Sequence, residues 1–262
     1  MTINFEKILI SGCSYTSGYG FENEKKNSRI WPNQLSQRLG SNHISNVSRT
    51  GANNEWIFLE AIGELSRNHY DLALVSWSTI PRFSYHVGLE LYTTHTKLQK
   101  SVDHYLVGNN KISSKWLDDI GDRLKKIHND HWDLLNLVKY VNVLTEYQHS
   151  RGGKIFFVNG IGPWSTNYFE KNTIAMPSDL DDYTYNLLDA DLRSDNEIFE
   201  LYDMIHNDYQ HYGGIRSEQW LNLYQSAKDL MIDTVALDTF HPGPESQDLL
   251  SNYFYSEIQS KL

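Results

Sequence analysis

The sequence predicts an α/β fold, with a mostly parallel sheet and helices on both of its faces. Two observations carry this prediction: short apolar runs of the length of buried strands recur along the chain, and segments with helical apolar spacing lie between them. This alternation is the pattern of βαβ units, whose crossover helices cover a parallel sheet. With 262 residues, the chain is long enough to bury a full core in one large domain.

The first strand, helix and second strand follow one another closely. The apolar run at residues 5–12 ends at Gly12, as a buried strand bounded by a small-residue turn does. Residues 31–40 have helical spacing, and Gly40 stops the helix. Residues 43–51 form a second short strand that ends in a loop.

The middle of the chain repeats the pattern. Residues 53–69 place apolar side chains at helical spacing, and the apolar run at 71–77 predicts the third strand. Helical spacing returns at about residues 135–147 and stops at two glycines, and the apolar run that opens residues 154–162 predicts a fourth buried strand.

The last strand is expected at residues 234–238, and a terminal helix runs from Glu245 onward. Two polar, aromatic-rich stretches, at about residues 80–130 and 165–222, fall outside the alternation. Neither is flanked by a linker rich in Pro, Gly or Ser, so we expect residues 1–262 to form one domain that carries two insertions.

Charge and composition argue against several classes of protein. A formal net charge of −10 disfavours a binder of nucleic acid, which normally carries a basic stripe. A single cysteine forms no internal disulfide, and no Cys/His spacing is typical of a zinc site. The N-terminal residues lack the basic flank of a signal peptide, and no apolar run approaches the roughly 18 residues of a membrane span. We therefore expect a cytoplasmic or otherwise soluble protein without a membrane partner; its oligomeric state is left open.

Polar residues with catalytic chemistry stand where the predicted strands end. Ser14 follows the first strand, and Asp238 and His241 follow the last, three residues apart. The carboxyl ends of parallel strands share one edge of a sheet, where α/β proteins bind ligands. A serine hydroxyl becomes a strong nucleophile when a histidine takes its proton and a carboxylate orients that histidine. These residues predict a catalytic triad in the chain order Ser, Asp, His.

Two rival interpretations concern the same turn. Cys13 is an alternative nucleophile, because a thiolate beside a histidine is potent. Adjacent residues of an extended segment point to opposite sides, so only one of Cys13 and Ser14 can face His241. Alternatively, Ser14 is a turn serine whose hydroxyl satisfies backbone groups after the strand.

Four sequence blocks resemble those of the SGNH (GDSL-like) hydrolase family. They read ILISGCSYTSGYG at residues 8–20, NVSRTGANNEWI at 46–57, YDLALVSWST at 70–79 and LDTFHPG at 237–243. The resemblance implies a flavodoxin-like three-layer α/β/α fold with a central, mostly parallel five-stranded sheet. It makes Ser14 the nucleophile and, through its N–H, an oxyanion donor. It makes Gly51 a second backbone donor, and it assigns the other triad roles to Asp238 and His241. Cys13 is then a small packing residue.

The sequence departs from the family pattern in two places. The family's Gly-Asp-Ser reads Gly-Cys-Ser here, which makes this a divergent member without touching the triad. The family's third block supplies an asparagine side chain to the oxyanion, and residues 76–81, SWSTIP, contain none. Ser78, Thr79 or Asn53 is the replacement that the sequence offers. For Asn53, capping of the following helix is an equal alternative.

These residues predict a serine esterase that acts through an acyl-enzyme on a small-molecule or carbohydrate ester. No metal and no organic cofactor is implied. The aromatic insertions favour a small acyl group, such as acetyl, on a carbohydrate over a long-chain lipid. Two alternatives use the same residues: a glycan- or partner-binding module that has lost efficient catalysis, and an O-acyltransferase that passes the acyl group to another sugar.

Overall fold

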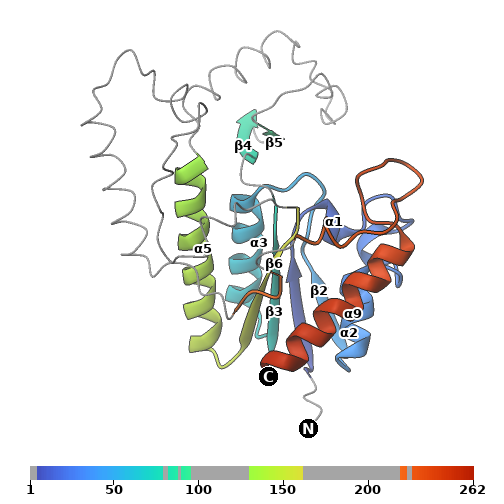
Figure 1. The fold of residues 1–262 in the computed structure, drawn as a ribbon. Helices are drawn as coiled ribbons and strands as arrows, with labels where there is room; N and C mark the ends of the chain where they lie inside the picture. The colour runs from blue at the N-terminus through green and yellow to red at the C-terminus, as the bar shows by residue number, and fades with distance from the viewer. Residues whose placement is uncertain (1–4, 79–81, 88–89, 96–129, 162–218, 223–225) are drawn as a thin grey trace, which may run out of the picture. The chain divides into compact units, whose positions relative to one another are not determined.

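A computed structural model describes residues 5–78, 82–87, 90–95, 130–161, 219–222 and 226–262 (Figure 1). The chain divides into two compact units. Unit 1 comprises Met1–Thr79, Tyr140–Trp164 and Arg216–Leu262, and unit 2 comprises Ile80–Lys139 and Ser165–Ile215. One domain with two insertions stays a prediction, because most of both stretches lies outside the described residues.

Unit 1 is built on a parallel sheet, which has the order β2-β1-β3-β6 in the described residues. Its strands are β1 (Lys7–Ser11), β2 (His43–Asn46), β3 (Leu72–Trp77) and β6 (Lys154–Asn159). β1 pairs in parallel with β2 and β3, and β3 pairs in parallel with β6. Every residue of β3 is buried, as its nearly continuous apolar sequence requires in a sheet covered on both faces. The predicted α/β class and the first four predicted strands are confirmed.

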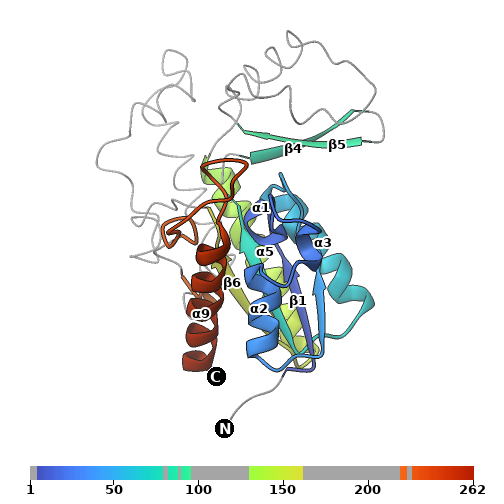
Figure 2. The same cartoon turned by 90° about the vertical axis from the view of Figure 1, so that its right-hand side faces the viewer.

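Helices cover both faces of this sheet (Figures 1 and 2). α2 (Trp31–Arg38) and α9 (Pro244–Lys261) lie side by side on one face. The other face carries α3 (Asn54–Arg67) and the unit 1 part of α5 (Asp130–Ser150). The main apolar cluster joins α2 and α9 to the sheet; it includes Trp31, Leu35, Ile10, Leu74 and Phe254. The helices predicted from apolar spacing are therefore present, with α5 longer than expected.

The fifth strand, predicted at residues 234–238, is not formed. Thr234 makes an isolated antiparallel bridge to Pro242, and the segment is otherwise irregular or turn. The reason is local: the N–H of Asp238 donates to the carbonyl of Val235 at 3.3 Å, which closes a tight turn within the predicted segment. A turn of this kind leaves no extended backbone for sheet pairing.

Unit 2 contains an antiparallel hairpin among its described residues. β4 (Arg82–Val87) pairs with β5 (Glu90–His95), so that Tyr85 lies opposite Tyr92. Both segments belong to the insertion predicted at about residues 80–130, in which no strands were expected. The alternation of polar and apolar residues in RFSYHV, at residues 82–87, was the available signal for β4.

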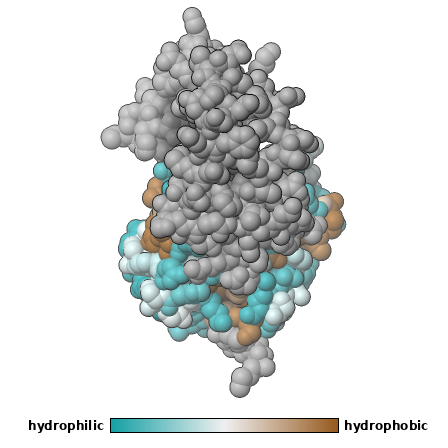
Figure 3. All heavy atoms as spheres, turned by 60° about the vertical axis from the view of Figure 1, so that its left-hand side comes forward, coloured by the Kyte–Doolittle hydropathy of each residue, from teal (hydrophilic) through white to brown (hydrophobic). Residues whose placement is uncertain are grey.

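The described surface mixes polar and apolar side chains, and on the face drawn in Figure 3 the two kinds are interspersed. None of the helices in the described residues has both the length and the apolar character needed to cross a membrane.

Candidate active site

Ser14 lies on a one-turn helix directly after β1. In α1 (Ser14–Ser17), the carbonyl of Cys13 accepts the N–H groups of Thr16, at 3.0 Å, and Ser17, at 2.9 Å. Gly18 ends the turn in the left-handed region, with φ 80°, and its N–H donates to the carbonyl of Ser14. The backbone that carries the Ser14 side chain is therefore held at both ends of the turn.

Gly12 gives this turn the space that it needs. A Cβ atom at Gly12 would lie 2.4 Å from Oγ1 of Thr16 and 3.1 Å from Cβ of Ser76, which is at the end of β3. β1 and β3 end side by side here, and the strand order reverses between them. Such a switch point is where open α/β sheets bind ligands.

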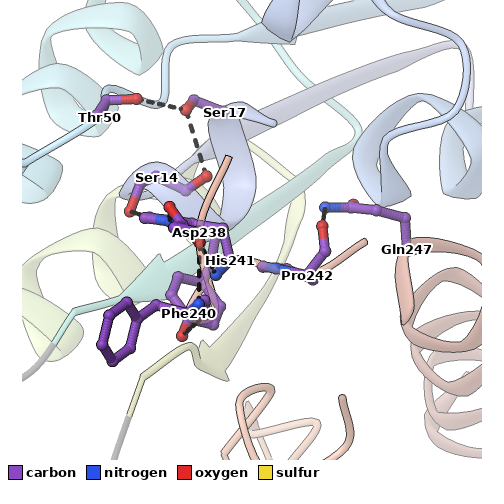
Figure 4. A network of polar contacts seen from close by, with 9 residues as sticks. Ser14, Ser17, Thr50, Asp238, Phe240, His241, Pro242 and Gln247 are labelled. Atoms are coloured by element: carbon purple, nitrogen blue, oxygen red, sulfur yellow. Dashed lines mark hydrogen bonds and ion pairs between the residues drawn. The ribbon is translucent and has the colours of Figure 1, made fainter. Parts of the chain in front are cut away.

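Asp238 and His241 approach Ser14 from the loop that precedes α9 (Figure 4). Nε2 of His241 lies 2.8 Å from Oγ of Ser14, and Nδ1 of His241 lies 2.7 Å from Oδ2 of Asp238. A carboxylate on Nδ1 favours the tautomer with its proton on that nitrogen, which leaves Nε2 as the acceptor for the serine proton. The structure thus brings together the three residues that the sequence predicted as a triad.

The surroundings of Asp238 favour its charged form. Burial raises the pKa of the Asp238 carboxyl, but the backbone N–H groups of His241 and Phe240 and the His241 imidazole together outweigh it. The pKa of Asp238 therefore lies below its ordinary value. At neutral pH the group is a carboxylate, the form that accepts a hydrogen bond from Nδ1.

The two residues predicted after β2 lie in the loop that leads into α3. Gly51 has φ 81°, a left-handed conformation that favours glycine. Its neighbour Thr50 places Oγ1 3.0 Å from Oγ of Ser17, so this loop lies against α1 (Figure 4). Asn53 is the N-cap of α3: its Oδ1 accepts the N–H of Trp56 at 2.9 Å, and its side chain is buried. The capping role that the sequence suggested for Asn53 is formed.

Ser78 and Thr79 were predicted as candidate oxyanion donors after β3, and the structure describes only Ser78. The N–H of Ser78 donates to Oδ1 of Asn54 at 2.8 Å, which ties the end of β3 to the start of α3. The Ser78 hydroxyl is buried and has no hydrogen-bond partner among the described residues. Thr79 lies outside the described residues.

The geometry separates the two rival nucleophiles. Cys13 is fully buried as the extended residue before α1, whereas the Ser14 hydroxyl is the group that contacts His241. The extended backbone at Cys13 turns the adjacent side chains to different sides, as expected from its conformation. This arrangement favours Ser14.

Two tyrosines beside the histidine were missed by the sequence analysis. The ring centroids of Tyr15 and Tyr19 lie 5.4 and 4.5 Å from that of His241. The hydroxyl of Tyr15 donates to the carbonyl of Phe240, which is 225 positions away in the sequence. Their spacing of four residues around the nucleophile turn was the available signal, but it does not point to so distant a partner.

Asp233, also missed, anchors the chain on the other side of His241. Its Oδ1 accepts the N–H of Ser246 at 2.7 Å, and its Oδ2 accepts that of Glu245 at 3.1 Å. Burial raises the pKa of Asp233, but the hydroxyl and N–H of Ser246 and the N–H of Glu245 outweigh it, so that the pKa is lowered. An ionised Asp233 therefore caps the start of α9 and fixes the chain that follows the histidine.

The groups that meet at this site carry nucleophilic and acid–base chemistry: a hydroxyl, an imidazole and a carboxylate. Such an arrangement can activate a hydroxyl for attack on an acyl carbon. In the part of the chain that the structure describes, no group of three or more His, Cys, Asp or Glu side chains is placed to hold a metal ion.

The chain is similar to several solved structures. No protein-family model and no curated protein matches the chain. TesA has 12% identity and a TM-score of 0.47, covering 98% of this chain and 99% of that one. The psychrotrophic esterase EstA from Pseudoalteromonas sp. has 13% identity and a TM-score of 0.45, covering 97% of both chains. A member of the lipolytic protein G-D-S-L family from Veillonella parvula DSM 2008 has 12% identity and a TM-score of 0.41, covering 98% of this chain and 99% of that one.

Proposed function

We propose that this chain is a serine ester hydrolase of the SGNH type. The observation that carries the proposal is the continuous chain of hydrogen bonds from Oγ of Ser14 through both ring nitrogens of His241 to Asp238, with steps of 2.8 and 2.7 Å. This geometry supports the assignment of Ser14 as nucleophile, His241 as base and Asp238 as orienting carboxylate, because it is the arrangement that a catalytic triad requires. The order of the motifs along the sequence supports the same assignment.

The first half of the reaction acylates the serine. Oγ of Ser14 attacks the acyl carbon of the ester while Nε2 of His241 takes the hydroxyl proton, which forms a tetrahedral oxyanion. The bond to the alcohol oxygen then breaks, and the histidine returns the proton to the leaving alcohol. The carboxylate of Asp238 stabilises the imidazolium that exists between these two transfers.

The second half releases the acyl group. A water molecule gives a proton to Nε2 of His241 and attacks the acyl-enzyme carbon. The new tetrahedral intermediate collapses, the bond to Oγ of Ser14 breaks, and the serine regains its proton from the histidine. The products are a carboxylic acid and the free enzyme, so the proton balance closes without a further group.

The oxyanion needs hydrogen-bond donors, and we propose the N–H groups of Ser14 and Gly51 and the side-chain amide of Asn53. Asn53 is favoured over Ser78 and Thr79 by its cap geometry. Since Oδ1 of Asn53 accepts from Trp56, the orientation of the amide is fixed, and its NH₂ group remains to donate elsewhere. A fixed donor is what an oxyanion site requires, because it needs no reorganisation during the reaction.

The variant Asn53→Asp is expected to lower kcat for ester hydrolysis by about 10²–10³-fold, because it removes the amide donor. Its thermal stability should change little, since aspartate and asparagine are comparable N-caps. Steady-state kinetics with p-nitrophenyl acetate and a thermal melt measure the two effects. Asn53→Ser, which also caps a helix, removes the amide without adding charge. If Asn53→Ser keeps the native kcat, the loss in Asn53→Asp comes from its charge, and Asn53 is not a donor.

For the substrate, we propose a small O-acyl ester, with an acyl group of acetyl size on a carbohydrate. The support is compositional: aromatic side chains that suit sugar rings occur in both stretches at 80–130 and 165–222, and no long apolar segment suits a fatty chain. An O-acyltransferase would use the same triad with a sugar hydroxyl in place of water. Competition between water and added sugar acceptors separates the two reactions, because only a transferase forms the new ester.

The proposed function is tested by labelling the native protein with a fluorophosphonate, which reacts with activated serines. We expect one adduct, located at Ser14 by peptide mass spectrometry. The physical reason is that Nε2 of His241, 2.8 Å from Oγ, removes the proton that makes an ordinary serine unreactive.

The same experiment distinguishes hydrolysis from a binding role. Absence of an adduct on protein that melts cooperatively would refute the hydrolase and favour the glycan- or partner-binding module. An adduct on Cys13 instead would assign the chemistry to the thiol. Protein unfolded in urea serves as the control, because the adduct should depend on the folded triad.

A further inference from the structure

The loop that carries Asp238 and His241 has little apolar packing of its own. Leu237 and Phe240 beside them are 72% and 64% exposed. Within the loop, the Asp238 carboxylate shapes the turn by accepting the N–H groups of Phe240 and His241. Such a turn has a defined shape, but its distance from Ser14 must be set by contacts with other elements.

Tyr15 supplies such a contact from the nucleophile helix. Its hydroxyl donates a hydrogen bond to the carbonyl of Phe240. The residue itself is firmly held: it is 5% exposed, and its carbonyl accepts Nε1–H of Trp31, in α2, at 3.1 Å. The ring also lies beside the imidazole, with 5.4 Å between the centroids of Tyr15 and His241. A rigid side chain therefore joins α1 to the exposed loop.

The two ends of this hydrogen bond are each one residue from a catalytic group. Tyr15 directly follows Ser14, and Phe240 directly precedes His241. The bond from the Tyr15 hydroxyl to the loop thus joins the same two segments as the 2.8 Å contact between Oγ of Ser14 and Nε2 of His241. A restraint so close to the reacting atoms limits how far the imidazole can move away from the serine.

We propose that Tyr15 is a positioning residue, whose hydroxyl holds the His241 loop at the distance that lets Nε2 take the proton of Ser14. The inference rests on the proposed function, since it assigns Tyr15 a part in activating the same serine. It acts through His241 and does not touch the substrate. The ring of Tyr19, 4.5 Å from the imidazole, packs on the histidine but does not replace this hydrogen bond.

The test is Tyr15→Phe, which keeps the ring and removes the hydroxyl. We expect the rate constant for fluorophosphonate labelling of Ser14 to fall by about ten- to a hundredfold, because misplacement of a catalytic group slows the chemical step. With p-nitrophenyl acetate, kcat should fall while KM stays the same. The proton on Nδ1 of His241, shifted downfield by its hydrogen bond to Asp238, should broaden in the NMR spectrum as the loop gains freedom.

The matched control is Tyr70→Phe, which removes an equally buried tyrosine hydroxyl away from the triad. Tyr70 precedes β3, is 2% exposed and donates to Oε1 of Glu64 at 2.6 Å. Both variants should lose similar thermal stability, but only Tyr15→Phe should label slowly. If both label at the native rate, Tyr15 has no positioning role; if both slow equally, its effect is only structural. A native protein that fails to label at all would instead refute the proposed function, so the two failures are distinguishable.

Discussion

Replacement of Ser14 by alanine is expected to lower kcat for ester hydrolysis by about 10⁶-fold and to abolish fluorophosphonate labelling. The fold should persist, because the hydrogen bonds that shape α1 come from the backbone of Cys13, Ser14 and Gly18. What remains is catalysis by the oxyanion donors and by substrate binding, which assist water directly. Burst and steady-state kinetics with p-nitrophenyl acetate measure the loss.

Two further variants make this prediction specific. The double variant Ser14→Ala, His241→Ala should hydrolyse the ester no more slowly than either single variant, because serine and histidine act as one unit. If the losses multiply, the two residues work independently and the triad is wrong. Ser17→Ala is the matched serine replacement on the same helix. It removes two contacts of the hydroxyl, with Oγ1 of Thr50 at 3.0 Å and with the carbonyl of Ser14 at 3.4 Å, and should cost no more than about tenfold, the effect of two modest hydrogen bonds.

The strands and helices that position this site could be predicted from the sequence. Fully buried strands such as β3 read as apolar runs, and helices such as α3 keep their apolar spacing, so the alternation of elements is visible residue by residue. The meeting of Ser14 with Asp238 and His241 was predicted from the motifs and from strand ends that share one edge of the sheet. The first strand end is present, but Asp238 and His241 follow an irregular segment and not a strand. Their catalytic roles stay predictions.

Other features depend on contacts that leave no periodic trace. The segment at 234–238 contains β-branched residues and was predicted as a strand, but a hydrogen bond from the N–H of Asp238 to the carbonyl of Val235 closes a turn within it. Tyr15 belongs to the site through a backbone carbonyl 225 positions away, and no side-chain pattern encodes a carbonyl. The sequence left Ser78, Thr79 and Asn53 open as oxyanion donors, because the choice depends on which side chain the fold orients. The helix cap that fixes Asn53 supports it, and its role as a donor stays a proposal. Such tertiary contacts override local propensity.

The carboxylate of Asp238 has the second largest expected effect: Asp238→Asn should lower kcat by about 10⁴-fold. The reason is the direction of the hydrogen bonds. In the variant, the amide oxygen is uncharged but can still accept hydrogen bonds from the N–H groups of Phe240 and His241, so that the turn is kept. The amide NH₂ then faces Nδ1 of His241 and can only donate to it. The imidazole must carry its proton on Nε2, where it blocks proton transfer from Ser14.

The pH dependence tests the same assignment. The native pKa of Asp238 lies below its ordinary value. Asp238 is therefore a carboxylate at every pH above the range in which an ordinary aspartate titrates, and it is protonated only when the pH falls through the lowered pKa. Between about pH 6 and 8, native Asp238 therefore stays charged, and the ratio of native to Asp238→Asn activity reports the tautomer instead of a titration of the aspartate. Kinetics at both pH values, with a melt to verify folding, measure this ratio. A variant within tenfold of the native rate at both would mean that the imidazole is oriented without Asp238, and that the hydrogen bond at 2.7 Å serves the turn alone.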